Sequence, residues 1–237
     1  MTTESMDEYI EAIYRLGGME RTVPVLDLAQ RLTVSVVSTN EMVKRLVTHG
    51  LVEYEPYRGI LLTPAGSRLA MRIVRCHRLW ERFLADKLNI PWDQVHEEAC
   101  RLEHVTSPLV EERLSRFLGE PSSCPHGNPV PDARHRPADE GQELSLCSLA
   151  EGQQAVVTRV LVEDSALLRH IETLGLRPDA LVEVEKAEPG GGPVTLRVAG
   201  VRRVVGEEVV AAVCVQVMEP RKNTEEHESR PLRQGPL

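Results

Sequence analysis

Residues 96–105, HEEACRLEHV, contain four side chains of types that bind metal ions: His96, Cys100, Glu103 and His104. On a helix, positions 96, 100 and 104 lie at i, i+4 and i+8, and position 103 lies beside them. One stripe therefore presents imidazole, thiolate and carboxylate donors, the groups from which divalent-metal sites are built. A solvated amphipathic helix with a buried cysteine has the same pattern, so the stripe alone leaves both interpretations open.

Two other segments carry paired donors at helical spacing. Glu8 and Glu11 are one turn apart near the N-terminus, and His77 and Glu81 are at i, i+4 in a longer helical pattern. A single pair is commonly explained by a solvated face or by a hydrogen-bonded histidine. Three helices that each present paired donors favour a metal site.

Motifs of catalysis are missing from the sequence. His96-Glu97 begins as the zinc-protease motif HExxH does, but position 100 is Cys, so the second zinc-binding histidine is absent. There is also no GxSxG, no phosphate-binding glycine-rich loop and no nucleotide fingerprint. We predict that the protein is not an enzyme, with a metallo-hydrolase that uses the His/Glu/Cys cluster as the alternative.

The composition is that of a folded protein with room for two or three small domains, at 237 residues and 41% hydrophobic. No apolar stretch approaches the roughly 20 residues that cross a bilayer, and the N-terminus does not resemble a signal peptide. We therefore expect a cytoplasmic protein with no membrane partner. Its five cysteines form no CxxC and, in a reducing compartment, are more often buried, reactive or metal-binding than paired.

The net charge of −8 excludes a surface that is basic all over, but charge is local. Between residues 31 and 75, seven Lys and Arg residues stand against three Glu residues. That region is suited to contact a polyanion.

The elements around this basic region are those of a winged helix-turn-helix. Apolar residues recur at helical spacing in 6–16 and 23–32, and Ser35 caps a further helix. Residues 51–63 alternate on both sides of a turn at residues 56–59, which predicts a β-hairpin. This order suits a recognition helix in the major groove and a wing beside the backbone. A small α+β unit without a DNA role is the alternative.

We expect base contacts from the start of the second helix of this motif, and phosphate contacts from the cations beyond it. The expected residues are Ser35, Val37, Ser38, Thr39 and Asn40 for bases, and Lys44, Arg45 and Arg58 for phosphates. Val37 suits a thymine methyl group, and phosphate contacts make binding salt-dependent.

Three more helices and a strand-rich region follow. Thr63-Pro64 begins a helix that runs to about Leu88, the opening stretch forms the next, and Ser107-Pro108 begins a third. Their apolar surface exceeds what three helices bury among themselves, so we expect self-association. Beyond a proline-rich linker, strands are expected within 154–162, 180–187, 194–200 and 209–217, with a turn at 190–193 and one short helix at 165–174. This predicts an SH3-like β-barrel.

Several motifs in this order resemble the diphtheria-toxin-repressor family of metal-dependent regulators, most closely a three-domain manganese regulator. The matching stretches are SMDEYIEAIY, the helix-turn-helix, HRLWERFL, HEEACRLEHV and CPHGNPVP, which cover residues 3–131 closely and the barrel more loosely. The resemblance implies an α+β multidomain chain. Its expected parts are a winged helix-turn-helix domain (1–74), an all-α dimerisation and metal-binding domain (75–127), a linker (128–142), an SH3-like, FeoA-like β-barrel (143–219) and a disordered tail (220–237).

The resemblance also implies metal ligands by position. The primary ligands would be Glu8, Cys100, Glu103 and His104, with Glu11 and His77 near them, and the ancillary ligands Glu81 and His96. In some three-domain members a second site uses the equivalents of Cys124, His126 and a barrel carboxylate, for which Asp164 is the candidate. An unligated pair in the linker is the alternative for Cys124 and His126.

The chain departs from both branches of the family. Iron regulators typically have Met, and manganese regulators Asp, at the position of Glu8, whereas Cys100 is of the iron type. Hard Mn²⁺ prefers carboxylates, so the glutamates favour Mn²⁺, with Fe²⁺ as the alternative. The resemblance implies a homodimeric repressor of metal-uptake genes that binds a palindromic double-stranded DNA operator. A regulator that does not respond to metal, and a barrel that binds peptides, are alternatives.

Overall fold

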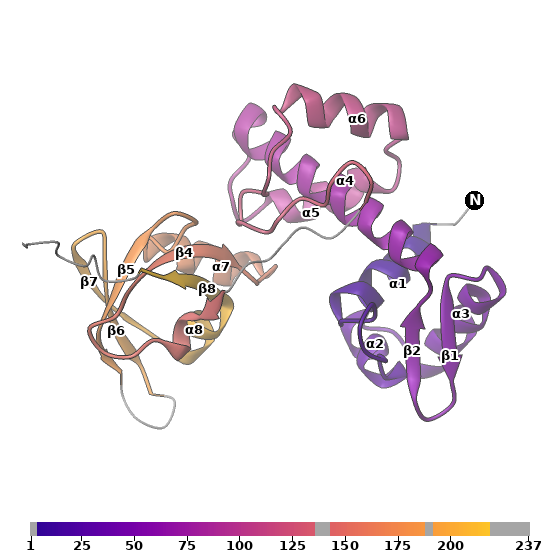
Figure 1. Cartoon of the computed structure of the whole chain (residues 1–237), viewed down its shortest axis with the longest axis horizontal. Helices are drawn as coiled ribbons and strands as arrows, with labels where there is room; N and C mark the ends of the chain where they lie inside the picture. Colours follow the sequence, from indigo (N-terminus) through magenta and orange to yellow (C-terminus); the bar gives the residue numbers. More distant parts are fainter. Residues whose placement is uncertain (1–3, 136–142, 188–191, 219–237) are drawn as a thin grey trace, which may run out of the picture.

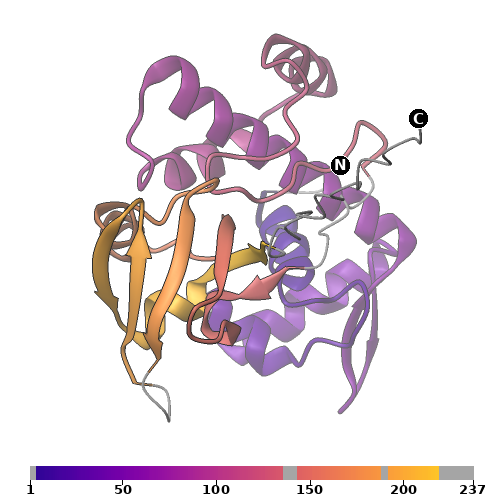
Figure 2. The same cartoon turned by 60° about the vertical axis from the view of Figure 1, so that its left-hand side comes forward.

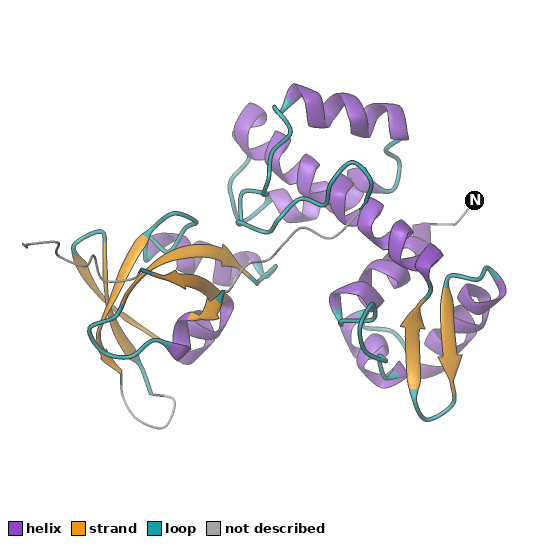
Figure 3. Cartoon of the chain, in the orientation of Figure 1, coloured by secondary structure: helices purple, strands orange, loops and turns teal. Residues whose placement is uncertain are grey.

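The computed structural model describes residues 4–135, 143–187 and 192–218. Figure 1 shows three parts: an N-terminal helix-and-hairpin unit, a group of helices, and a C-terminal β-domain (residues 143–218). Figure 3 shows that helices predominate in the first two parts, beside the hairpin of the N-terminal unit, and that strands predominate in the β-domain. No helix among the described residues is long and apolar enough to cross a membrane.

The N-terminal unit is a winged helix-turn-helix, as predicted. Its elements are α1 (Glu4–Arg15), α2 (Val25–Arg31), α3 (Val36–Thr48), β1 (Val52–Glu55) and β2 (Gly59–Leu62). Ser35 caps α3 by accepting a hydrogen bond from the N–H of Ser38 (3.1 Å), which satisfies one of the helix's free donors. The two strands form an antiparallel hairpin that pairs Val52 with Leu62.

The hairpin is fixed to the helices through backbone contacts. Val23, just before α2, exchanges hydrogen bonds with Ile60 of β2 (2.8 and 2.9 Å). Gly59 has a φ of +117°, and a Cβ there would lie 2.7 Å from the carbonyl oxygen of Val23, so only glycine fits. The wing therefore moves together with α1 and α2.

The helical part consists of α4 (Pro64–Leu88), α5 (Val95–Glu103) and α6 (Pro108–Phe117). Thr63 and Ser107 cap α4 and α6, and each helix begins with proline, as predicted. The first half of α4 contributes Ala70 and Ile73 to the core of the N-terminal unit. Its second half packs against α5, so α4 connects the two parts (Figure 1).

The segment that ends the expected helical domain and begins the expected linker packs on α4. Cys124, His126 and Val130 are buried, and the carbonyl of Ser123 accepts hydrogen bonds from Arg82 (2.8 and 3.1 Å). Residues 136–142 of the expected linker, part of the turn at 190–193 and the tail from residue 220 lie outside the described residues.

The β-domain is a six-stranded antiparallel sheet in the order β3-β8-β4-β5-β6-β7 around an apolar core. Its elements are β3 (Leu144–Ser145), η1 (Leu146–Ser148), β4 (Gln154–Val160), α7 (Ser165–Thr173), β5 (Leu181–Ala187), β6 (Val194–Val198), β7 (Val201–Val205), α8 (Glu207–Ala212) and β8 (Val213–Val217).

Two assignments in this domain were wrong. The segment 209–217 was expected to be one strand, but residues 207–212 form α8 and only the remainder forms β8. Glu207 and Glu208 lie in the first turn of α8, where carboxylates favour a helix start, and Val209 and Val210 are buried from it. Strand β7 was missed in the sequence. It lies at the exposed edge of the sheet, so its residues do not alternate regularly between apolar and polar.

The loop between α4 and α5 joins the helical part to the β-domain. Trp92 is part of the β-domain core, and Asp93 is buried and accepts hydrogen bonds from Ser165 (2.9 Å) and Arg169 (2.8 Å). In the turned view the β-domain lies below the helices and beside the N-terminal unit (Figure 2). All three parts can therefore contribute to one site.

Candidate metal centre

Carboxylates and imidazoles from three helices meet where α1 crosses α4 and α5. Donor atoms of Glu11, His77 and Glu103 all lie within 4.8 Å of one another, and the three residues are buried. His77 Nδ1 lies 2.6 Å from Glu103 Oε2. This group joins the DNA-binding unit to the helical part.

His77 also belongs to a second group, with His96 and Cys100. Its Nε2 lies 3.0 Å from His96 Nδ1, and the Cys100 sulfur lies 3.9 Å from His77 Nδ1 and 3.7 Å from His96 Nε2. The i, i+4 spacing of His96 and Cys100 on α5 thus turns both side chains toward α4, as the stripe predicted.

A third group comprises Glu81, Cys124 and His126, all buried. Glu81 Oε1 lies 3.4 Å from His126 Nδ1 and 3.1 Å from His77 Nε2, so this group is continuous with the others. His126 Nε2 lies 2.9 Å from the carbonyl oxygen of Trp92, a contact that orients the ring. The interpretation of Cys124 and His126 as an isolated linker pair does not fit this packing.

Glu8 and Asp164, two of the expected ligands, lie outside the cluster. Glu8 is exposed and, within the described residues, belongs to none of the donor groups. Asp7 points inward instead, with Oδ2 3.9 Å from His104 Nδ1, because Asp7 and Glu11 share a face of α1 (i, i+4). His104 lies beside Glu103, with Nε2 3.2 Å from its Oε1.

Asp164 does not reach the cluster either, because it is the N-cap of α7. Its Oδ1 accepts a hydrogen bond from the N–H of Leu167 (2.8 Å). The preceding residue, Glu163, supplies the β-domain carboxylate, with Oε2 3.8 Å from His96 Nε2. The expected start of this helix at Ser165 would have identified Asp164 as the cap and left Glu163 free.

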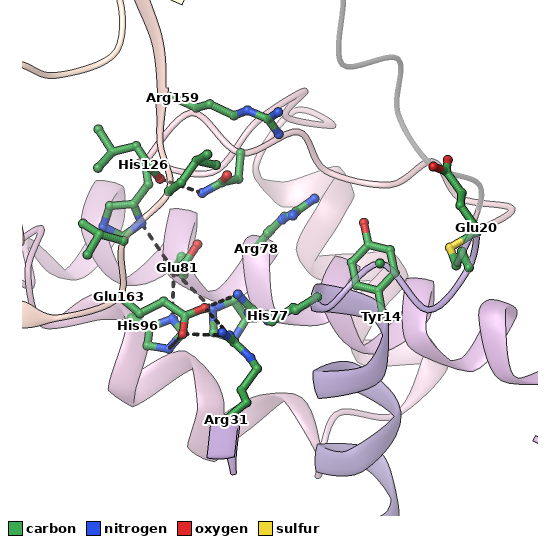
Figure 4. Close-up of a pocket in the computed structure, with 17 residues that line it drawn as sticks. Tyr14, Glu20, Arg31, His77, Arg78, Glu81, His96, His126, Arg159 and Glu163 are labelled. Carbon is green, nitrogen blue, oxygen red and sulfur yellow. Dashed lines mark hydrogen bonds and ion pairs between the residues drawn. The ribbon is translucent and has the colours of Figure 1, made fainter. Parts of the chain in front are cut away.

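The cluster faces an open cleft of about 860 Å³, lined by α1, α4, α5 and the β-domain. Figure 4 shows His77, Glu81, His96, His126 and Glu163 pointing toward one another, with Arg31 extending to Glu163. The cleft therefore gives a small ion access from solvent to these five donors.

Opposite charges hold these side chains together. Although burial opposes it, hydrogen bonding and the Glu81 charge raise the pKa of His126 to about 10 and that of His77 well above its usual value. The pKa of His96 is raised to about 9 in the same way, against burial, through Cys100 and Glu81. Burial opposes the shift of Glu81 as well, but the facing imidazoles hold its pKa well below the usual range.

The donors fit a divalent cation. Buried nitrogen, oxygen and sulfur donors converge, and His104 Nδ1 is buried without a hydrogen-bond partner among the described residues. Such an orphaned nitrogen costs free energy unless a ligand satisfies it. Glu11, His77, Cys100, Glu103 and His104 could hold one ion, and Glu81, His96, Cys124, His126 and Glu163 a second.

Because the imidazoles carry protons at neutral pH, metal binding should release protons. A ring nitrogen binds metal only in its deprotonated form, so the apparent affinity should rise as pH rises toward the pKa values of about 9 and about 10. Each proton released should raise the apparent metal affinity about tenfold per pH unit. Between pH 6 and pH 8 the affinity should therefore rise at least about 100-fold. Calorimetry with Mn²⁺ in two buffers of different ionisation enthalpy measures the protons directly. Equal heats in both buffers would contradict this expectation.

The expected DNA-contact residues divide into accessible and inaccessible ones. Val37 is 74% exposed, but Thr39 is 0% exposed and its hydroxyl donates to the carbonyl of Ser35 (3.0 Å), so a base contact from Thr39 is wrong. The reason is helix rotation, which turns position 39 toward the core beside Val43.

Several of the other polar residues already have partners on the protein. Ser35 and Ser38 are 2.9 Å apart through their hydroxyls, and the Asn40 amide donates to the Val36 carbonyl (3.0 Å). Lys44 pairs with the exposed Glu41 (2.7 Å). The other two expected phosphate contacts differ in their partners. Arg58 pairs with Glu55 (2.9 Å), whereas Arg45 is exposed and forms no ion pair among the described residues.

Three family models match the chain in order. They are the N-terminal DNA-binding domain of iron dependent repressors (residues 1–60), their metal-binding and dimerisation domain (63–132) and the FeoA domain (144–217). The iron-dependent repressor IdeR of Mycobacterium tuberculosis strain H37Rv is 36% identical over 225 residues, which are 90% of this chain and 97% of that protein. The chain belongs to the diphtheria-toxin-repressor family.

Solved structures of this family show the same architecture. A manganese-dependent transcriptional repressor in complex with manganese superposes with a TM-score of 0.81 at 29% identity, covering 90% of this chain and 99% of that one. The manganese regulator SloR has a TM-score of 0.74 at 30% identity and covers 90% and 98%. The resemblance read from the sequence is confirmed.

Membership of the family decides between several alternatives. The protein is a metal-dependent, DNA-binding repressor and not an enzyme, so a metallo-hydrolase and a regulator indifferent to metal are both wrong. The DNA-binding and dimerisation domains imply a DNA operator and a homodimer. Consistent with a dimer, the outer surface of the helical part exposes Val105, Leu109, Val110 and Phe117.

Proposed function

We propose that this repressor responds to Mn²⁺, with Fe²⁺ as the alternative ion, and that it represses metal-uptake genes through a palindromic operator. One observation carries the proposal: buried donors from α1, α4 and α5 converge at a point that joins the DNA-binding unit to the dimerisation helices. Among them are Glu11 and Glu103, and Mn²⁺ favours such hard carboxylate donors. Cys100 and Cys124 pull toward softer ions, and the relative from Mycobacterium tuberculosis is named an iron-dependent repressor.

The residues of the centre explain how DNA binding would depend on metal. Glu11 on α1 and Glu103 on α5 are buried at the junction, where burial and repulsion by the Glu11 charge raise the pKa of Glu103 although the His77 imidazole lies 2.6 Å from it. A bound divalent cation supplies the positive charge that removes this repulsion. Glu11 and Asp7 then hold α1 against α4 and α5, which fixes the angle of each winged unit on the dimer. The two α3 helices must lie about one DNA turn, or a multiple of it, apart.

A DNA-binding titration with a panel of metals tests the proposal. Labelled fragments from upstream of metal-uptake genes are mixed with the protein, and fluorescence anisotropy is followed with Mn²⁺, Fe²⁺ under anaerobic conditions, Zn²⁺, Mg²⁺ or a chelator. We expect binding with Mn²⁺ at lower concentrations than with the other ions, and its reversal by chelator. Equal binding in chelator would refute metal control, and a stronger response to Fe²⁺ would select the alternative ion.

Arg45 should make a phosphate contact, because it is the cation on α3 with no ion pair among the described residues. Arg45→Ala should weaken binding to operator and to unrelated DNA alike, and should lower the slope of log affinity against log salt by about one. Anisotropy titrations at several salt concentrations provide the measurement. A loss confined to one base pair of the operator would contradict the phosphate role.

A further inference from the structure

Arg15, at the C-terminal end of α1, contacts two carboxylates from different parts of the chain. Its Nε and Nη2 donate to Glu11 Oε1 at 2.9 and 2.7 Å, and its Nη1 donates to Glu163 Oε1. Arg31 of α2 reaches the other oxygen of Glu163 at 3.2 Å. One guanidinium thus connects α1 with the β-domain.

Both of these carboxylates belong to the metal centre. Glu11 lies with His77 and Glu103, and Glu163 lies beside His96. The two hydrogen bonds from Arg15 occupy Glu11 Oε1, and its positive charge lies among the donors that would face a divalent ion. A carboxylate bound to a guanidinium must exchange that partner, or share it, before it binds a metal.

We propose that Arg15 is an internal cation that occupies Glu11 and Glu163 in the metal-free protein, so that it lowers the affinity for metal and holds the DNA-binding unit against the β-domain. This inference rests on the proposed function, because it concerns the same centre. It assigns Arg15 the role of a positioning residue that sets the metal concentration at which the repressor responds.

The position of Arg15 separates this role from a purely structural one. Its side chain is 25% exposed and lines the cleft, outside the apolar cores. Loss of a structural arginine would loosen the site and weaken metal binding. Loss of a competing cation should tighten metal binding, because both carboxylates become available and a nearby positive charge disappears.

The test compares matched neutral variants by competition for Mn²⁺ against a fluorescent chelator. Arg15→Gln should bind Mn²⁺ at least about tenfold more tightly than the wild type. Arg31→Gln, which removes contacts to Glu163 but none to Glu11, should tighten binding less. Arg101→Gln on α5 removes the same charge from an exposed side chain that pairs with the half-buried Glu98 and with none of the donors, and should change affinity less than about twofold.

A second readout needs no metal. Small-angle X-ray scattering of the chelator-treated protein should show a more extended particle for Arg15→Gln and for Arg31→Gln than for the wild type, and no change for Arg101→Gln. Circular dichroism establishes that each variant is folded. If Arg15→Gln does not fold, Arg15→Lys replaces it, because one ammonium group cannot make the three contacts of the guanidinium, and its affinity should also increase.

The outcomes distinguish the two claims. Unchanged or weaker Mn²⁺ binding by the Arg15 variants, with a wild type that binds Mn²⁺, would overturn the role of Arg15 and leave the proposed function intact. A wild-type protein that binds neither Mn²⁺ nor Fe²⁺ would overturn the proposed function and the inference with it.

Discussion

Replacing Glu103 with glutamine should remove the response of operator binding to metal. Glu103 is 5% exposed and stands between His77 (2.6 Å) and His104 (3.2 Å), close to Glu11 of α1. An amide of the same size carries no charge to bind a cation, and it leaves a buried hydrogen-bonding group imperfectly paired. We expect Mn²⁺ affinity to fall at least about 100-fold, which corresponds to about 2.7 kcal/mol.

The same helix offers a control for this substitution. Glu98 is half-buried, belongs to none of the donor groups and pairs with Arg101, so Glu98→Gln makes the same chemical change outside the centre and should leave Mn²⁺ affinity and operator binding unchanged. Both variants are compared by anisotropy over a Mn²⁺ titration. Operator binding by the Glu103 variant at wild-type Mn²⁺ concentrations would show that Glu103 is not a ligand.

Arg75→Ala should destabilise the helical part by about 3–5 kcal/mol, because it breaks a buried ion pair. Arg75 is 8% exposed; it donates to Glu111 (3.0 Å), Ser115 (2.8 Å) and the Pro131 carbonyl (2.5 Å). These bonds tie α4 to α6 and to the segment that carries Cys124 and His126. Their loss also leaves the Glu111 carboxylate buried with weaker partners.

Urea unfolding followed by tryptophan fluorescence measures this loss, since Trp80 packs in the apolar clusters of the helical part. Arg113→Ala on α6 is the matched control, because Arg113 is exposed and its loss should change the free energy of unfolding by less than about 0.5 kcal/mol. A difference below about 1 kcal/mol between the two variants would show that the buried arginine network contributes little to stability.

The helix starts were predictable because their signals are local. Ser35, Thr63 and Ser107 cap the helices that begin after them, and proline follows the latter two. The pattern of residues 209–217 predicted one strand, which was wrong. A short apolar helix followed directly by a buried strand gives one continuous apolar run, and periodicity does not divide it.

The candidate site was predictable where it depends on spacing along one helix. His77 with Glu81, and His96 with Cys100, follow from positions four apart on α4 and α5. The rotation of each helix about its own axis is set by tertiary packing, which spacing does not reveal. For that reason Asp7 was missed in favour of Glu8, and Thr39 was assigned to the DNA surface although it is buried.

Contacts between segments far apart in the chain could not be predicted from the sequence. Glu163 is more than 100 residues from Arg15 and Arg31, and no local pattern links them. Trp92 likewise packs into the β-domain from the loop between α4 and α5, and nothing in its sequence neighbourhood indicates that partner.

Whether an ion binds between α1, α4 and α5 can be seen in a crystal grown with Mn²⁺, with data collected on both sides of the manganese absorption edge. We expect an anomalous peak bounded by Glu11, His77 and Glu103, with α1 held against α4 and α5. If the protein binds its operator and the crystals are saturated with Mn²⁺, an anomalous map without a peak among these residues would refute this metal site.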